Sequence, residues 1–129
     1  MVSELCLTMT KIIPTLRVFD YAKTLEFYVE WLGCTIKGEY KPEGSPFWMQ
    51  VAIRDVVIAL SEHHGDGSPG AQISIVGFEG LEGYHQQLMD KHYKYMKPGL
   101  HKVEWDLHTL EMTVIDPFGN RIIFNETFK

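Results

Sequence analysis

The chain has 129 residues, 45% of them hydrophobic and 22% charged, which is typical of one compact globular domain. Its 12 basic and 17 acidic residues give a formal net charge of -5, and the basic residues are scattered, which excludes the basic stripe of a nucleic-acid-binding protein. No apolar run approaches the roughly 18 residues of a membrane span, and the N-terminus lacks the basic start of a signal peptide. The two cysteines, Cys6 and Cys34, have neither metal-binding nor disulfide-motif spacing. We therefore expect a single cytoplasmic domain over residues 1–129 that contacts neither nucleic acid nor membrane.

The first half of the chain predicts one strand, one helix and three further strands. Residues 11–18 alternate as in a strand, and Asp20 offers a helix N-cap before apolar side chains at helical spacing over 21–32. Gly33 is placed to end that helix. Strand-like runs then follow at 34–40, 47–53 and 56–61.

The same order of elements repeats in the second half of the chain. A polar, glycine-rich loop, a strand, a helix and two strands are predicted, in that order, at 63–70, 72–76, 81–93, 109–115 and 121–127. A less regular stretch through Pro98 and Gly99 follows the helix, and residues 116–120 form a tight turn between the last two strands. Two βαβββ modules, at about 11–62 and about 71–127, therefore account for most of the chain and predict an α+β fold.

Three motifs resemble those of a known family. They are LRVFD at 16–20, followed by TLEFY and WLG; SEHHGDG at 61–67; and TVIDPFGNRIIF at 113–124. Together they resemble the glyoxalase/bleomycin resistance protein/dihydroxybiphenyl dioxygenase superfamily, also called the vicinal oxygen chelate superfamily, in its bleomycin-resistance-like branch. The resemblance implies two modules that each curl a mixed sheet into half of an open barrel. It also implies a homodimer with ligand clefts on the concave sheets.

The resemblance further locates where the metal enzymes of this superfamily carry their ligands. Three of the four positions fall on Ile13, Ala59 and Ile123, and the remaining one falls on Ala71 or Gln72. A metal needs three or more converging donor atoms, and apolar side chains supply none. We therefore expect no metal, no cofactor and no catalytic residue of the metal-dependent kind.

Strand alternation predicts what lines the cleft instead. A hairpin around Arg54 and Asp55 would pair Gln50 with Ala59 and Trp48 with Ser61, and a hairpin pairing Ile115 with Arg121 would set Glu111 opposite Asn125. Trp105 lies near the place where relatives carry a Trp-Gly pair before the penultimate strand. The residues predicted to bind a ligand are Arg17, Trp48, Gln50, Ser61, Trp105, Glu111 and Asn125.

The histidine loop allows two interpretations. His63 and His64, with Glu62 and Asp66, are the clustered set that could seat a metal or act as acid and base. Alternatively, the loop only connects the two modules, with Asp66 fixing a turn.

The predicted function is metal-free binding of a small molecule by a homodimer. Bleomycin-type antibiotics, or similar aromatic and cationic compounds, would be sequestered by stacking on Trp48 and Trp105 and by the charge of Glu111. One alternative is a glyoxalase- or dioxygenase-type enzyme with a rearranged metal site that uses Gln72, Glu111 or the histidine loop. Another is a domain without a ligand, whose dimer surface is its function.

Overall fold

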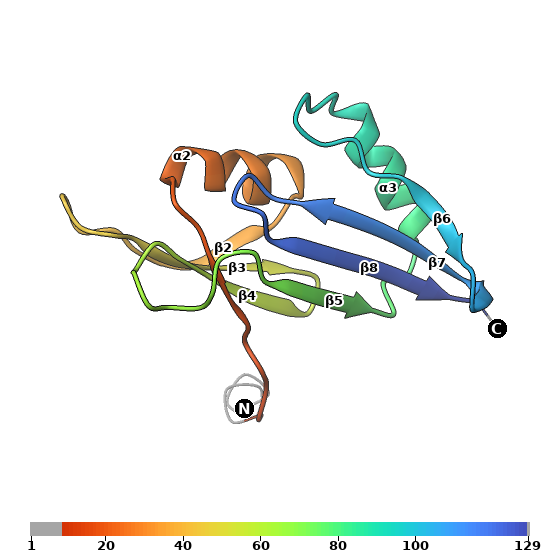
Figure 1. The fold of residues 1–129 in the computed structure, drawn as a ribbon, viewed down its shortest axis with the longest axis horizontal. Coiled ribbons are helices and arrows are strands. Elements are labelled where there is room, and N and C mark those ends of the chain that lie inside the picture. Colours follow the sequence, from red (N-terminus) through yellow and green to blue (C-terminus); the bar gives the residue numbers. More distant parts are fainter. Residues whose placement is uncertain (1–8, 129) are drawn as a thin grey trace, which may run out of the picture.

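The computed structural model describes residues 9–128, which form two four-stranded sheets and three helical segments (Figure 1). The first sheet has the strand order β1-β4-β3-β2 and the second the order β5-β8-β7-β6. In chain order the elements are β1 (Thr15–Arg17), α2 (Tyr21–Thr24), η1 (Leu25–Trp31), β2 (Thr35–Tyr40), β3 (Trp48–Ile53), β4 (Val56–Ser61), β5 (Gln72–Val76), α3 (Leu81–Asp90), β6 (Leu100–Val103), β7 (Asp106–Ile115) and β8 (Arg121–Thr127).

Each half of the chain contributes a strand, a helical segment and three antiparallel strands, and its four strands form one sheet. The first strand of each unit pairs in parallel with the last one, β1 with β4 and β5 with β8. Both sheets are therefore mixed, and the predicted α+β fold of two βαβββ units is confirmed. Among the described residues, no helix is long and apolar enough to cross a membrane.

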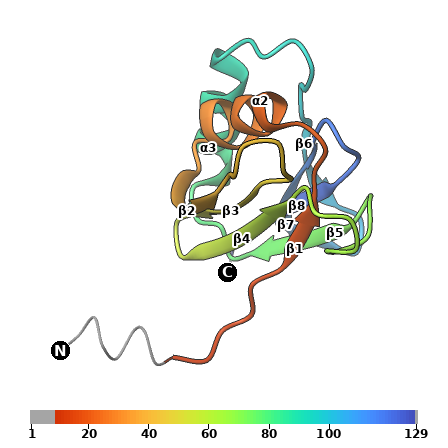
Figure 2. The same ribbon diagram turned by 90° about the vertical axis from the view of Figure 1, so that its left-hand side faces the viewer.

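The continuous helix formed by α2 and η1 lies on the same side of the two sheets as α3 (Figures 1 and 2). The strand residues that point to this side are apolar and almost completely buried, as with Met49 and Leu60 in the first sheet and Met112 and Phe124 in the second. We call the opposite face of each sheet, which no helix covers, its outer face. Because side chains alternate along a strand, the residues between these core positions belong to the outer face.

The first helix follows its predicted range but not its predicted geometry. The Asp20 side chain accepts a hydrogen bond from the Lys23 N–H at 2.9 Å, so this residue is the expected N-cap. From Leu25 onward the turns widen to a π-helix, with the Leu32 N–H donating to the Phe27 carbonyl. Apolar spacing does not distinguish a wide turn from an ordinary one. Gly33 ends the helix with φ +84°, as predicted.

Several element boundaries differ from the prediction. β1 is shorter than 11–18, since Pro14 has no N–H to offer the sheet, although its carbonyl still accepts from Ala59. α3 ends at Asp90, and two residues later His92 adopts the left-handed conformation with φ +52°, which the helix cannot continue through. β6 was not predicted, because it is short and directly follows a proline–glycine pair.

A buried polar network joins the two halves at the turn between β7 and β8. The Tyr28 hydroxyl donates to Asp116 at 2.6 Å, and Asp116 also accepts from the backbone N–H groups of Phe118 and Asn120. The Asn120 amide donates to the Arg17 carbonyl at 2.7 Å. The predicted tight turn at 116–120 is thereby confirmed, and it also holds the end of β1.

Candidate functional site

One row of side chains crosses the outer face of the first sheet. The strand register aligns Arg17 with Ser61, Ser61 with Trp48, and Trp48 with Tyr40, on four successive strands. The predicted pairing of Trp48 with Ser61 is confirmed. Tyr40 was missed by sequence reasoning, because its place beside Trp48 depends on a register shift in β2 at 36–38.

The next row of the same face contains Thr15, Ala59, Gln50 and Gly38. The predicted pairing of Gln50 with Ala59 is confirmed. We call the first row, through Tyr40 and Trp48, the aromatic row. The second row is small and polar beside it, so the outer face of the first sheet combines two aromatic side chains with the amide of Gln50. Such a combination is typical of small-molecule sites.

The outer face of the second sheet carries a polar row. Asn125 lies opposite Glu111, as predicted, and Glu111 lies opposite His101 on β6. The His101 Nε2 atom is 3.6 Å from the Glu111 Oε1 atom. The side-chain oxygen of Asn125 is buried and has no hydrogen-bond partner in the described residues. His101 was missed because β6 itself was missed.

The other predicted site residues lie in different surroundings. Ser61 is fully buried, and its hydroxyl donates to Asp66 at 2.9 Å while accepting from the His63 N–H. Trp105 lies in the turn between β6 and β7 with 81% of its surface exposed. Arg17 turns its guanidinium toward the end of the sheet, where Nη2 donates to the Glu62 carbonyl at 3.2 Å.

The positions that hold a metal elsewhere in the superfamily do not fit a metal here. Ala59 and Ile123 lie on the outer faces, and neither has a donor atom. Gln72 is exposed and pairs with Arg121. Within residues 9–128, no group of three or more His, Cys, Asp or Glu side chains could hold a metal ion. No chemistry that passes through a metal follows from this arrangement.

The histidine loop is organised as a turn. The Ser61 and Asp66 side chains are bonded to each other, and the Asp66 N–H donates to the His63 carbonyl at 3.1 Å. Gly67 then passes close to β1, where a Cβ atom on it would lie 3.0 Å from the Thr15 carbonyl oxygen. The prediction that Asp66 fixes a turn is confirmed.

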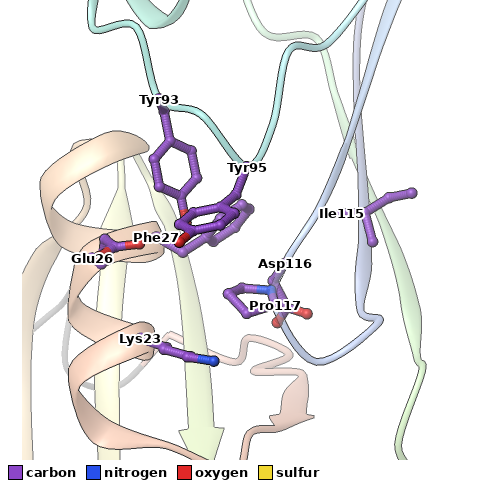
Figure 3. A pocket seen from close by; sticks show the side chains of 8 residues that line it. All are labelled: Lys23, Glu26, Phe27, Tyr93, Tyr95, Ile115, Asp116 and Pro117. Carbon is purple, nitrogen blue, oxygen red and sulfur yellow. The ribbon is translucent and has the colours of Figure 1, made fainter.

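A cavity of about 320 Å³ lies away from these rows, between η1, the loop after α3 and the β7–β8 turn (Figure 3). Phe27, Tyr93 and Tyr95 form its aromatic wall, with Glu26 beside them. Burial raises the pKa of Tyr93 to about 12, and Glu26 adds to this, although the two groups are outside hydrogen-bonding geometry. Sequence reasoning missed this cavity because the helix was predicted to continue to Tyr93, whereas α3 ends at Asp90 and both tyrosines lie in the loop after it.

Two repeated βαβββ units with open outer faces define the vicinal oxygen chelate fold. A family model described as glyoxalase superfamily protein matches residues 3–129, and the chain belongs to this superfamily. The predicted superfamily membership is thereby confirmed. No curated protein matches the chain in sequence.

Solved structures of low sequence identity share the fold. One is a bleomycin resistance determinant encoded on transposon Tn5, with 18% identity, a TM-score of 0.69, and coverage of 94% of this chain and 100% of that one. A bleomycin-binding protein complexed with bleomycin has 20% identity and a TM-score of 0.65, with 93% and 100% covered. An antibiotic binding protein from a Streptomyces species has 16% identity and a TM-score of 0.67, with 94% and 98% covered.

Proposed function

We propose that this protein binds and sequesters a small aromatic, cationic molecule of the bleomycin type, without transforming it. The observation that carries the proposal is the register of the two outer faces, which groups an aromatic row around Trp48 and a carboxylate–amide row around Glu111. Fold-sharing proteins that bind antibiotics, one of them seen with bleomycin, support the same conclusion.

The aromatic row would supply most of the binding energy. Trp48 is partly buried between its neighbours, so its orientation is restricted before a ligand arrives, while one face of the sheet remains free of helices. Stacking of a planar ring on such a side chain contributes about 0.5–1.5 kcal/mol beyond the buried area. Gln50, one row away, would fix the orientation of the ring through its amide.

The second sheet would supply recognition of charge. Glu111 lies 3.6 Å from the basic side chain of His101, and His101 is exposed. A cationic group of the ligand would displace His101 from Glu111. The unpartnered oxygen of Asn125 is a further acceptor on the same face.

Assembly and cellular location are part of the proposal. No described helix covers either outer face (Figures 1 and 2), and a homodimer that places the first sheet of one copy near the second sheet of the other would close a cleft between the two rows. Arg17 and Trp105 would lie at the edges of that cleft, and the buried Ser61 would lie at its base. A cytoplasmic location is supported by the buried Cys34, which is a free thiol.

The test is a calorimetric titration of the chelator-treated protein with metal-free bleomycin, together with sedimentation to give the oligomeric state. We expect one saturable site per chain in a dimer, and a loss of about tenfold or more in affinity for Trp48→Ala, which is about 1.4 kcal/mol. Glu111→Gln should weaken binding and reduce its dependence on salt. Tyr95→Ala, in the cavity of Figure 3, is the matched aromatic control and should bind as the natural chain does.

Three outcomes would contradict the proposal. A flat titration would remove bleomycin-type compounds as ligands. Loss of binding in Tyr95→Ala but not in Trp48→Ala would show that the ligand binds in the cavity of Figure 3 and not beside Trp48. About one transition-metal ion per chain in carefully prepared protein, with activity that a chelator removes, would favour the enzymatic alternative.

A further inference from the structure

Arg17 is a buried charge without an acidic partner. Only 9% of its surface is exposed, and its described hydrogen bond is the one from Nη2 to the Glu62 carbonyl. Its Nε atom is buried and has no hydrogen-bond partner within residues 9–128. In the part of the chain that the structure describes, the one ion pair within 4.0 Å is His101–Glu111, which involves neither Arg17 nor its neighbours.

Such a side chain is unfavourable for stability unless something else balances its charge. Buried guanidinium groups are normally paired with carboxylates or fully hydrogen-bonded, because removing a charge from water costs several kcal/mol. The ring of Phe19, with its centroid 4.8 Å from the guanidinium carbon, stabilises the cation in part. It cannot satisfy the Nε–H, which is a directional donor.

The guanidinium lines a cavity of about 540 Å³ at the end of the first sheet. This cavity lies between the start of α2 and the 41–47 loop, and it contains none of the other residues predicted to bind a ligand. Phe19, Tyr21 and Phe47 are its aromatic lining, and Lys41 and Glu62 are its other charged residues.

Two of the three charged residues that line this cavity, Arg17 and Lys41, are cations. The Lys41 amine lies 4.7 Å from the centroid of the Tyr21 ring. The one acidic lining residue, Glu62, accepts a hydrogen bond from the Phe47 N–H at 3.2 Å and is not within ion-pair distance of Arg17. Arg17, Lys41 and Glu62 are the charged lining residues, and the Glu39 carboxylate, which accepts a hydrogen bond from the Tyr21 hydroxyl, lies beside them.

We propose that the Arg17 cavity binds the carboxylate of a small molecule with an aromatic body. A carboxylate matches the planar fork of an arginine guanidinium, and one bound in this cavity would balance the buried charge of Arg17. The aromatic lining provides a surface for the rest of the ligand. This proposal goes beyond the function proposed above: Arg17 belongs to the row that contains Trp48, but its guanidinium lines a cavity that contains neither Trp48 nor Glu111.

The experiment is a titration of the full chain with benzoate, followed by the amide signals in ¹H–¹⁵N NMR spectra. We expect saturable shifts at Phe47 and Glu62, and none of comparable size with benzamide, which has the same shape but no charge. Arg17→Met should weaken benzoate binding about tenfold or more, since it removes both the charge and the fork. Arg121→Met is the matched control: Arg121 is exposed on β8, the net charge changes equally, and benzoate affinity should stay within about twofold.

Stability measurements separate a ligand site from a structural role. If Arg17 serves a ligand, Arg17→Met without benzoate should melt at the same temperature as the natural chain or higher, because an uncompensated buried charge has been removed. Benzoate should raise the melting temperature of the natural chain but not that of Arg17→Met. Arg17→Lys, which keeps the charge but not the fork, should bind benzoate several-fold more weakly, and it remains informative if the methionine variant does not fold.

Four results would overturn this proposal: no binding of benzoate to the natural chain, equal binding of benzamide, unchanged benzoate affinity in Arg17→Met, or equally tight binding of inorganic phosphate at the same amides. The last would indicate a general anion site instead of a carboxylate site. The two proposals fail separately. Trp48→Ala should keep benzoate binding even if it loses bleomycin, so a negative bleomycin titration leaves the Arg17 cavity untouched.

Discussion

Replacing Asn120 by alanine should destabilise the protein strongly, because this side chain connects the two halves of the molecule. Asn120 is completely buried in the turn between β7 and β8. Its amide nitrogen donates to the Arg17 carbonyl at 2.7 Å and to Asp116 Oδ2 at 2.8 Å, and its oxygen accepts from the Ala71 N–H at 3.1 Å. The partners lie at the end of β1, just before β5, and in the turn itself.

The magnitude follows from these three hydrogen bonds. Each contributes about 1 kcal/mol net, and a buried partner left without its hydrogen bond adds about 1–3 kcal/mol. Water cannot easily replace the lost amide in a site without exposure, so the Ala71 N–H would remain unsatisfied. The sum is a loss of about 4–6 kcal/mol, against a total stability of about 5–15 kcal/mol for a domain of this size.

Urea unfolding, followed by circular dichroism, measures this loss directly. Asn120→Ala should lower the midpoint without changing the slope with urea concentration. Asn125→Ala is the matched control on the neighbouring strand, since its side-chain oxygen has no described partner, and it should cost about 1 kcal/mol or less. The reasoning is refuted if the two variants lose the same stability, or if Asn120→Ala unfolds within about 1 kcal/mol of the natural chain.

Two further predictions concern alkaline stability and the histidine loop. Burial raises the pKa of Cys34 to about 12 and the pKa of Tyr28 well above its usual 10, so the folded chain keeps protons that the unfolded chain releases. Stability should therefore be constant below about pH 9 and fall above it, by up to about 1.4 kcal/mol per pH unit for each group until its folded pKa is reached. Urea unfolding at stepped pH checks this, and a Cys34→Ala chain whose loss of stability began no later and was no less steep would contradict the part assigned to the thiol. In the loop, Gly67→Ala should cost about 1–3 kcal/mol, because the new Cβ would lie 3.0 Å from the Thr15 carbonyl oxygen at φ +73°. Gly65→Ala, also at positive φ but with nothing within 4 Å, should cost less in the same assay, and equal costs would contradict the close approach.

The order of elements was predictable because local rules agree with one another along most of this chain. Apolar alternation located β4, β5 and β8 at their observed ends, and Asp20 and Gly33 marked the limits of the first helix. The prediction was weakest at β6 and at the π-helical turns. In both places the backbone is decided by packing against neighbouring elements, which leaves no periodic signal in the sequence.

For the candidate site, the hairpins made part of the geometry predictable. A turn at Arg54 and Asp55 fixes the pairing of Trp48 with Ser61, since the register of a short hairpin follows from its turn. The same reasoning placed Glu111 opposite Asn125. Tyr40 and His101 could not be added, because their strands reach the row through a register shift or an irregular edge.

By itself, the sequence determined the repeated βαβββ order, the faces of the residues in the two hairpins around Trp48 and Glu111, and the apolar character of the positions that hold a metal in related enzymes. These properties depend on spacing of a few residues and on side-chain chemistry, which a linear chain already contains. Only the tertiary structure decided that the Ser61 hydroxyl is used within its own loop, that Asn120 joins the two halves, and that Arg17 is buried without an acid. The first depends on how one loop folds back on itself, and the other two depend on which groups meet across distant parts of the chain, where burial changes the free energy of a charge or a hydrogen bond more than any local preference does.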